Sequence, residues 1–165
     1  MGIMSDSHDR LAAVDAAVQF FNGRPVDLVL HAGDHVAPFA VRRYESLKAD
    51  WRGVFGNNDG EREGLEKASL GRIQSDHLVL EPGGLRILLV HRMEDAGPIL
   101  QEDPSVRVVV FGHSHSAGVE ERDDGRLWVN PGELCGYLTG RSSVALLDTE
   151  SLDVELVTLS PGPAR

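Results

Sequence analysis

The stretch Met1-Gly2-Ile3-Met4-Ser5-Asp6-Ser7-His8-Asp9 decides the fold of this chain. Its first four residues form a short apolar run, which predicts a buried strand, and polar residues follow at once. Side chains two apart on an extended backbone point to the same side, so Asp6 and His8 are placed to face one cation. Asp6 or Asp9 could instead cap a following helix, since aspartate is a common N-cap residue. Later segments decide between these interpretations because several of them end in the same way.

The N-terminal third of the chain alternates strands with helices. Apolar residues recur at helical spacing from Leu11 to Phe21, and a second helix is expected to begin at Pro38. The predicted apolar face of this second helix is Phe39, Ala40, Tyr44 and Leu47. Residues 27–32 and 51–55 are apolar runs that predict buried strands. The order strand, helix, strand, helix, strand indicates an α/β fold with a parallel sheet, whose polar groups collect at the carboxyl ends of the strands.

The remainder of the chain is dominated by predicted hairpins. Their strand pairs are residues 76–81 with 85–90, 119–122 with 126–130, and 143–147 with 152–159. Between them, residues 94–101 predict at most a short helix that Gly97-Pro98 interrupts, and residues 106–111 predict a β-branched strand. One domain over residues 1–160, with two sheets, explains the change from alternating strands and helices to hairpins better than two small domains do. Residues 161–165 are expected to form a flexible tail.

The composition of the chain limits the cell compartments and the binding partners that we expect for it. The length of 165 residues suits one domain. The net charge of −10 argues against non-specific binding to nucleic acid or to anionic lipid. Cys135 is the only cysteine, so no intrachain disulfide can form, and we expect it to be a small buried residue. No apolar stretch approaches the roughly 20 residues of a membrane span, and no signal peptide is visible. These features predict a cytoplasmic protein.

Polar side chains follow five of the apolar runs. They are Asp6 and His8, then Asp34, Asn57 and His91, and finally His113 and His115. Mixed imidazole and carboxylate ligands suit borderline transition metals better than magnesium or calcium alone. Seven ligands exceed what one tetrahedral ion takes. With one bridging carboxylate, they suit two ions about 3.5–4 Å apart.

The order of these blocks resembles that of the calcineurin-like metallophosphoesterase family, and most of all its small bacterial and archaeal phosphodiesterases. The blocks D-x-H, G-D, G-N, H and G-H-x-H stand here as Asp6-Ser7-His8, Gly33-Asp34, Gly56-Asn57, His91 and Gly112-His113-Ser114-His115. The segment Asn130-Pro131-Gly132-Glu133 is a weaker resemblance, and the match extends from Asp6 to Gly140. The resemblance to this family implies a four-layer α/β fold, in which two mixed β-sheets pack as a sandwich with flanking helices.

The resemblance also implies a ligand set and a mechanism. Asp6, His8 and His115 would bind one metal ion. Asn57, His91 and His113 would bind a second ion, and Asp34 would bridge the two. The implied cofactors are two divalent transition metal ions, manganese first, with nickel, iron or zinc as alternatives. A bridging hydroxide would attack phosphorus in line with the leaving oxygen. The predicted catalytic residues are Asp34, Asn57 and His113. The predicted partner is a small phosphodiester, and a homo-oligomer is compatible with the sequence.

Two departures from the family pattern bear on the substrate. Asn58 stands where many members carry a histidine that protonates the leaving group, and an amide cannot supply that proton. General acid catalysis contributes about 10²–10⁴-fold, so a diester with a good leaving group is favoured. A phosphomonoesterase or nucleotidase is the alternative, and a non-catalytic scaffold is a third interpretation. Asn58 is predicted to hydrogen-bond the substrate phosphate. Arg92 either binds that phosphate or is a surface residue.

Two further side chains near these blocks carry open interpretations. Asp59 could replace the missing proton donor only if its carboxyl stayed protonated near neutral pH. His31 either supports a metal ligand or is a core histidine with its own hydrogen-bond partners.

Overall fold

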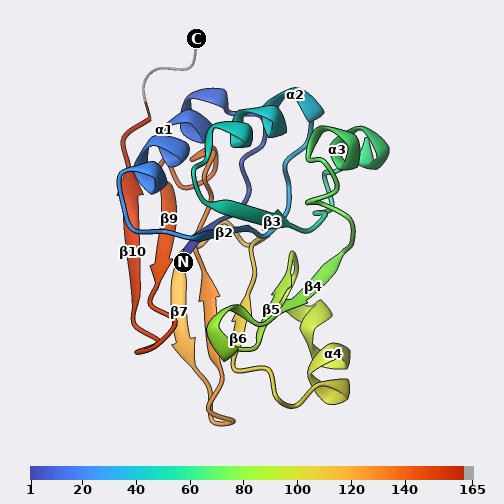
Figure 1. Cartoon of the computed structure of the whole chain (residues 1–165), viewed down its shortest axis with the longest axis vertical. Helices are drawn as coiled ribbons and strands as arrows, with labels where there is room; N and C mark the ends of the chain where they lie inside the picture. Colours follow the sequence, from blue (N-terminus) through green and yellow to red (C-terminus); the bar gives the residue numbers. More distant parts are fainter. Residues whose placement is uncertain (162–165) are drawn as a thin grey trace.

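The computed structural model describes residues 1–161 and contains two five-stranded sheets (Figure 1). The first sheet contains β1 (Gly2–Met4), β2 (Leu28–His31), β3 (Asp50–Gly53), β9 (Ser142–Leu147) and β10 (Val154–Leu159). The second contains β4 (His77–Leu80), β5 (Ile87–Val90), β6 (Val108–Val110), β7 (Gly118–Glu121) and β8 (Leu127–Asn130). The strand orders are β10-β9-β1-β2-β3 and β4-β5-β6-β8-β7. The predicted tail lies outside the described residues, except for Pro161.

Four α-helices and three short 3₁₀ turns complete the described part of the chain. The helices are α1 (Leu11–Asn22), α2 (Pro38–Val41), α3 (Arg62–Ala68) and α4 (Ala96–Glu102), and the turns are η1 (Arg42–Ser46), η2 (Pro82–Gly84) and η3 (Met93–Asp95). In Figure 1, α1, α2 and α3 lie on the side of the first sheet, and α4 lies at the second sheet. Across residues 1–161, no helix is both long enough and apolar enough to cross a membrane.

Apolar side chains form three layers between these elements, because neighbouring residues of a strand face opposite sides of its sheet. In β5, Leu89 packs between the two sheets with Ile3 of β1, whereas Leu88 faces outward and packs near Ala96 of α4. On the first sheet, Met4 faces the helices and packs in the same cluster as Phe21 of α1. The order is therefore helices, sheet, sheet, helix, which confirms the predicted fold of two mixed sheets with flanking helices.

Parallel pairing brings the carboxyl ends of the central strands together. β1 pairs in parallel with β2, and β2 pairs in parallel with β3. In the second sheet, β5 and β6 are also parallel. A contact between loops of the two sheets, His91 Nδ1 to the Ala32 carbonyl oxygen at 2.8 Å, places the segments that leave these five strands on the same side of the sandwich. The chain is placed to gather polar residues there.

Most predicted elements are present, but two helices differ from the prediction. The helix that begins at Pro38 ends at Val41 and continues as η1, and Phe39 is 56% exposed rather than part of the buried face. The helix α4 passes through Gly97-Pro98, which was predicted to interrupt it. Pro98 lies in the first turn of α4, where a backbone N–H has no partner within the helix in any case. Proline is therefore tolerated at this position.

The alternative interpretation of Asp6 and Asp9 as helix caps is wrong. Arg10 occupies the N-cap position of α1, and no side chain donates or accepts a capping hydrogen bond there. Asp9 instead accepts a hydrogen bond of 2.9 Å from the Ala37 backbone N–H, so it links two loops.

We predict that Leu89→Ala lowers the free energy of unfolding by about 2–5 kcal/mol, because it opens a cavity between the two sheets. The matched control is Leu156→Ala on β10, where the side chain is 40% exposed and the loss should be about 0.5 kcal/mol. Urea unfolding measures both variants. Equal losses would show that the layer between the sheets does not dominate stability.

Candidate metal centre

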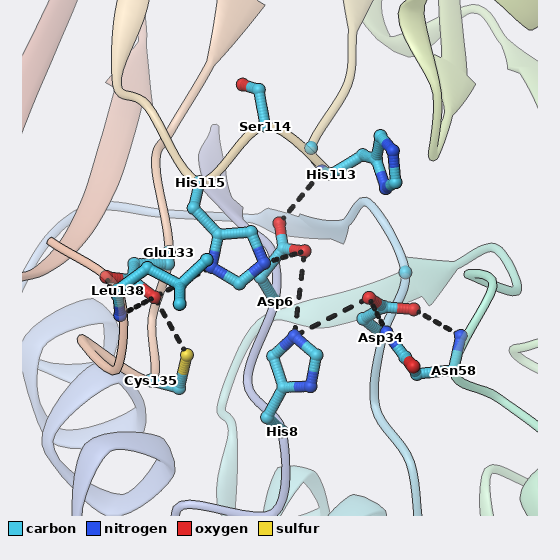
Figure 2. Close-up of polar contacts among 12 residues, drawn as sticks. Asp6, His8, Asp34, Asn58, His113, Ser114, His115, Glu133, Cys135 and Leu138 are labelled. Atoms are coloured by element: carbon cyan, nitrogen blue, oxygen red, sulfur yellow. Dashed lines mark hydrogen bonds and ion pairs between the residues drawn. The ribbon is translucent and has the colours of Figure 1, made fainter.

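All seven predicted ligand residues converge at the carboxyl ends of five strands. Asp6 and His8 follow β1, Asp34 follows β2, and Asn57 follows β3. His91 follows β5, and His113 and His115 follow β6. Asp6, Asp34 and His91 are buried, whereas Asn57 and His113 are exposed at the mouth of the site. Figure 2 shows Asp6, His8, Asp34 and His115 pointing toward one another.

Asp34 lies at the centre of the cluster. Its Oδ2 atom is 3.5 Å from His8 Nε2 and 3.5 Å from His91 Nε2. His91 Nε2 is also 3.0 Å from Asn57 Oδ1, and the His91 ring lies 5.1 Å from the His113 ring. One carboxylate oxygen therefore stands between two histidines that come from different sheets.

Asp6 occupies the other end of the cluster. Its Oδ1 atom is 3.4 Å from His115 Nε2 and 3.9 Å from His8 Nε2. The rings of His8 and His115 stack with their centroids 5.3 Å apart. The second carboxylate oxygen, Oδ2, accepts a hydrogen bond of 3.1 Å from the His113 backbone N–H. Asp6 therefore connects the loop after β1 to the loop after β6.

The polar atoms of this cluster fit a bound cation. Within residues 1–161, Asp6 Oδ1 and His8 Nε2 are buried without a hydrogen-bond partner. Unpartnered buried polar atoms are costly, and a cation between them would remove the cost. Two ligand atoms that share an ion at about 2.1 Å are about 3–4 Å apart, which matches the separations at Asp6 and Asp34. Asp6, His8 and Asp34 can offer one ligand atom each within 4.8 Å of one another.

The backbone is left-handed at five of the seven residues. The φ angles are 52° at Asp6, 39° at His8, 60° at Asp34, 65° at His113 and 60° at His115. Such residues cost about 1–3 kcal/mol each and occur mainly at functional sites. These left-handed residues lie in the segments after β1, β2 and β6, where they change the direction of the chain as it leaves the strand.

Burial and neighbouring charges set the protonation of the buried groups. Burial raises the pKa of Asp34, but His91 and the hydrogen bonds from Asn58 outweigh it and hold the pKa well below its usual range. Burial lowers the pKa of His91, yet its interaction with Asp34 raises it overall. Burial also raises the pKa of Asp6, which the nearby Ser5 hydroxyl and the charges of His91 and His115 only partly offset. Asp34 is therefore the more strongly stabilised anion of the two.

Asn58 and Asp59 both bond to the loop that carries Asp34. Asn58 donates from its side-chain amide to Asp34 Oδ2 and from its backbone N–H to Oδ1, each at 2.8 Å. The carboxylate of Asp59 accepts from the backbone N–H groups of Asp34, Val36 and Gly56 at 3.1, 2.6 and 2.7 Å. Asp59 thus serves as a structural acceptor that joins the loops after β2 and β3. Binding of Asn58 to substrate stays a prediction.

Glu133 is a participant that the sequence did not reveal. It is fully buried, and its Oε2 atom is 2.7 Å from His115 Nδ1. Burial raises the pKa of Glu133, but hydrogen bonds from His115 and the Thr139 backbone outweigh it and lower the pKa to about 2. Figure 2 shows this carboxylate behind His115, on the side away from Asp6. The only signal in the sequence was the weak Asn130-Pro131-Gly132-Glu133 resemblance.

Two other residues near the cluster are buried. Cys135 is buried, as predicted, and its Sγ lies within 4.8 Å of ligand atoms of His8 and His115. Its thiol donates to Glu133 Oε2 at 3.1 Å, and burial raises the pKa of the thiol to about 12. His31 Nε2 lies 3.1 Å from Ser7 Oγ, which is in turn 3.1 Å from the Tyr44 hydroxyl. His31 therefore supports the Asp6-Ser7-His8 segment through its contact with Ser7.

Arg92 lies beside the cluster rather than within it. The residue is half-buried and lines a cavity of about 230 Å³ together with Asn57, His91, Phe55 and Arg62. Arg62 is held over the Phe55 ring at 4.7 Å and forms a 2.8 Å ion pair with Asp76. Asp76 and Asp95 line the same cavity, so its two guanidinium groups face two carboxylates next to Asn57 and His91.

The family model for the calcineurin-like phosphoesterase superfamily domain matches residues 1–152 of this chain. The chain belongs to this superfamily. The calcineurin-like phosphoesterase family was predicted from the strand-end blocks, and the match confirms it. Membership also confirms the predicted class of enzyme, a hydrolase of phosphoesters, and it implies divalent metal ions as cofactors.

Two curated archaeal proteins and one solved structure are similar to this phosphoesterase over nearly their full lengths. Phosphodiesterase MJ0936 of Methanocaldococcus jannaschii is 37% identical over 164 residues, which cover 96% of this chain and 98% of the relative. A probable metallophosphoesterase of Methanothermobacter thermautotrophicus is 33% identical, covering 95% and 91%. The structure of an archaeal phosphodiesterase superposes with a TM-score of 0.87 at 36% identity, covering 96% and 98%.

We predict that Gly112→Ala destabilises the protein by about 1–3 kcal/mol. A Cβ at Gly112 would overlap Ser5 Oγ and lie 2.6 Å from Asp6 Oδ2. The matched control is Gly97→Ala in α4, where a Cβ meets no described atom within 4 Å, and it should be neutral or stabilising. Urea unfolding compares the two variants. A neutral Gly112→Ala would show that the loops after β1 and β6 can separate freely.

Proposed function

We propose that this protein is a phosphodiesterase that depends on two divalent metal ions. The observation that carries the proposal is the position of Asp34, one oxygen of which stands 3.5 Å from histidines on either side. Asp6, His8 and His115 would hold one ion, and Asn57, His91 and His113 would hold the other. Manganese is the proposed metal, with nickel, iron or zinc as alternatives, because the donor set mixes imidazole with carboxylate and amide oxygen.

Divalent cations held by these residues would stabilise the charge that develops at phosphorus and would make water nucleophilic at neutral pH. The residues of the chain determine how that chemistry is directed. Asp34 is held by two hydrogen bonds from Asn58, one from its side-chain amide and one from its backbone N–H. His91 Nδ1 is 2.8 Å from the Ala32 carbonyl oxygen, and this contact directs His91 Nε2 toward Asp34. Asn57 and His113 are exposed and stand at the entrance, where a phosphoryl group would arrive.

The cavity beside Asn57 and His91 is the proposed site for one ester group of a small phosphodiester. Arg92 lines it and is placed to donate to a phosphate oxygen as a planar, bidentate group. The net charge of −10 would repel an anionic substrate, so local cations are needed to bring it in. The metal ions would provide most of that local positive field, because Asp76 and Asp95 balance the charges of Arg62 and Arg92 in the cavity. The relatives named phosphodiesterases support the same substrate class.

The choice of a diester over a monoester rests on proton supply. Asn58 carries no acidic proton, and the Asp59 carboxylate is occupied as an acceptor for three backbone N–H groups. Neither residue is suited to protonate a poor leaving group. We therefore propose activated or otherwise good leaving groups as the preferred substrates.

We predict that Asp34→Asn lowers manganese-dependent hydrolysis of an activated aryl phosphodiester by at least about 100-fold. Asparagine tolerates the left-handed backbone at this position, so the fold should be retained. Turnover, metal content and the circular dichroism spectrum are measured together. The matched control is Asp15→Asn on the exposed surface of α1, which should keep wild-type turnover. Failure of the metal-loaded wild type to hydrolyse the diester with any divalent ion would remove the proposed function.

We predict that Asn58→His raises hydrolysis of an alkyl phosphate monoester relative to the diester, by up to about 100-fold, because imidazole can protonate the leaving oxygen. Asn58 is exposed, so a larger ring can be accommodated. The ratio of kcat/KM values for the two substrates is the measurement. Asn58→Ala is the control, since it removes the same hydrogen bond to Asp34 without adding an acid. An unchanged ratio in Asn58→His would show that proton supply does not limit monoester hydrolysis.

A further inference from the structure

Glu133 is a buried carboxylate outside the proposed ligand set, and its two oxygens are surrounded by donors. Oε2 accepts from His115 Nδ1, from the Cys135 thiol and from the Tyr137 backbone N–H. Oε1 accepts from the backbone N–H and the hydroxyl of Thr139, at 2.5 and 2.7 Å. The Leu138 N–H lies 3.0 and 3.1 Å from the two oxygens. Both oxygens therefore act only as acceptors.

This arrangement determines which nitrogen of His115 carries the proton. A neutral imidazole has one donor and one acceptor nitrogen. Because Glu133 Oε2 accepts at 2.7 Å, the proton must be on Nδ1, and Nε2 keeps its lone pair. Nε2 is the atom that faces Asp6 Oδ1 at 3.4 Å. His115 is thereby held in the tautomer and orientation that a cation next to Asp6 requires.

The backbone fixes Glu133 to the same strand end. The Leu134 N–H donates to the Ser5 carbonyl at 2.8 Å, and the Cys135 N–H donates to the Asp6 carbonyl at 3.0 Å. The segment 133–139 then folds around the carboxylate through its own N–H groups. The position of His115 relative to Asp6 is therefore set by a loop about 20 residues later in the sequence, and not by the β6 turn alone.

We propose that Glu133 is a positioning residue for the metal centre, which holds His115 in its Nδ1-protonated tautomer so that Nε2 faces the cation beside Asp6. The inference rests on the proposed two-metal function. A carboxylate behind a metal-binding histidine fixes the ring and raises its basicity, and loss of such a partner lowers metal affinity about 10–100-fold. Glutamine does not replace Glu133, because its NH₂ group would face N–H donors on either side.

The direct test is ¹⁵N NMR of the histidine rings in the metal-free protein at about pH 8, where imidazole is neutral. The signals of His115 are assigned by their loss in His115→Gln. In the wild type we expect a protonated Nδ1 and an unprotonated Nε2. In Glu133→Gln we expect a mixture of the two tautomers. A wild-type His115 with its proton on Nε2 overturns the proposal, whether or not Glu133→Gln folds.

The second test is calorimetric titration of the metal-free protein with Mn²⁺. Glu133→Gln should bind one of the two ions about 10–100-fold more weakly than the wild type. Thr139→Ala is the matched control: it removes one donor to Glu133 and leaves His115 untouched, so its affinity should remain close to that of the wild type. Equal weakening in both variants would assign the effect to loop folding and overturn the proposal.

The wild-type titration separates this proposal from the proposed function. If the wild type binds no divalent ion, both fail. If the wild type binds two ions and Glu133→Gln binds them with the same affinities, only the role of Glu133 fails.

Discussion

The structure depends on the sharing of one carboxylate between two groups of imidazoles. Asp34 is largely withdrawn from solvent, and its negative charge is retained there because histidines and amide donors surround it. Burial of a charge is unfavourable unless partners compensate for it. The sandwich provides those partners from both sheets, since His8 comes from the first sheet and His91 from the second. Packing of the two sheets against each other therefore brings the partners of Asp34 together.

The rigidity of the strand ends explains how a strained cluster persists. Five residues in left-handed conformations would together cost several kilocalories per mole. Three apolar layers, with Leu89 and Ile3 in the central one, hold the strands on which these turns are built. Acceptors within the loops add to this support: Asp59 joins the loops after β2 and β3, and Glu133 joins the loops after β1 and β6.

The sequence predicted the fold and the grouping of the seven residues because both follow from local pattern. Apolar runs mark the strands, and in a parallel sheet the residues after them must gather at one edge. What it missed depends on distant folding. Glu133 acquires its role only when residues 137–139 turn back on it, and Asp59 acquires its role from a loop 25 residues earlier. Pro98 was misread because its effect depends on where α4 begins.

The left-handed turns also limit which amino acids can replace one another at the metal centre. Aspartate, asparagine and histidine are the side chains, besides glycine, that enter this conformation most readily, and aspartate and histidine occupy all five left-handed positions of the centre. An exchange among these types at Asp6 or His113 leaves the chain path unchanged. Substitutions among these residue types can therefore change which metal the site prefers, or abolish metal binding, while the two-sheet fold and its surface shape are retained.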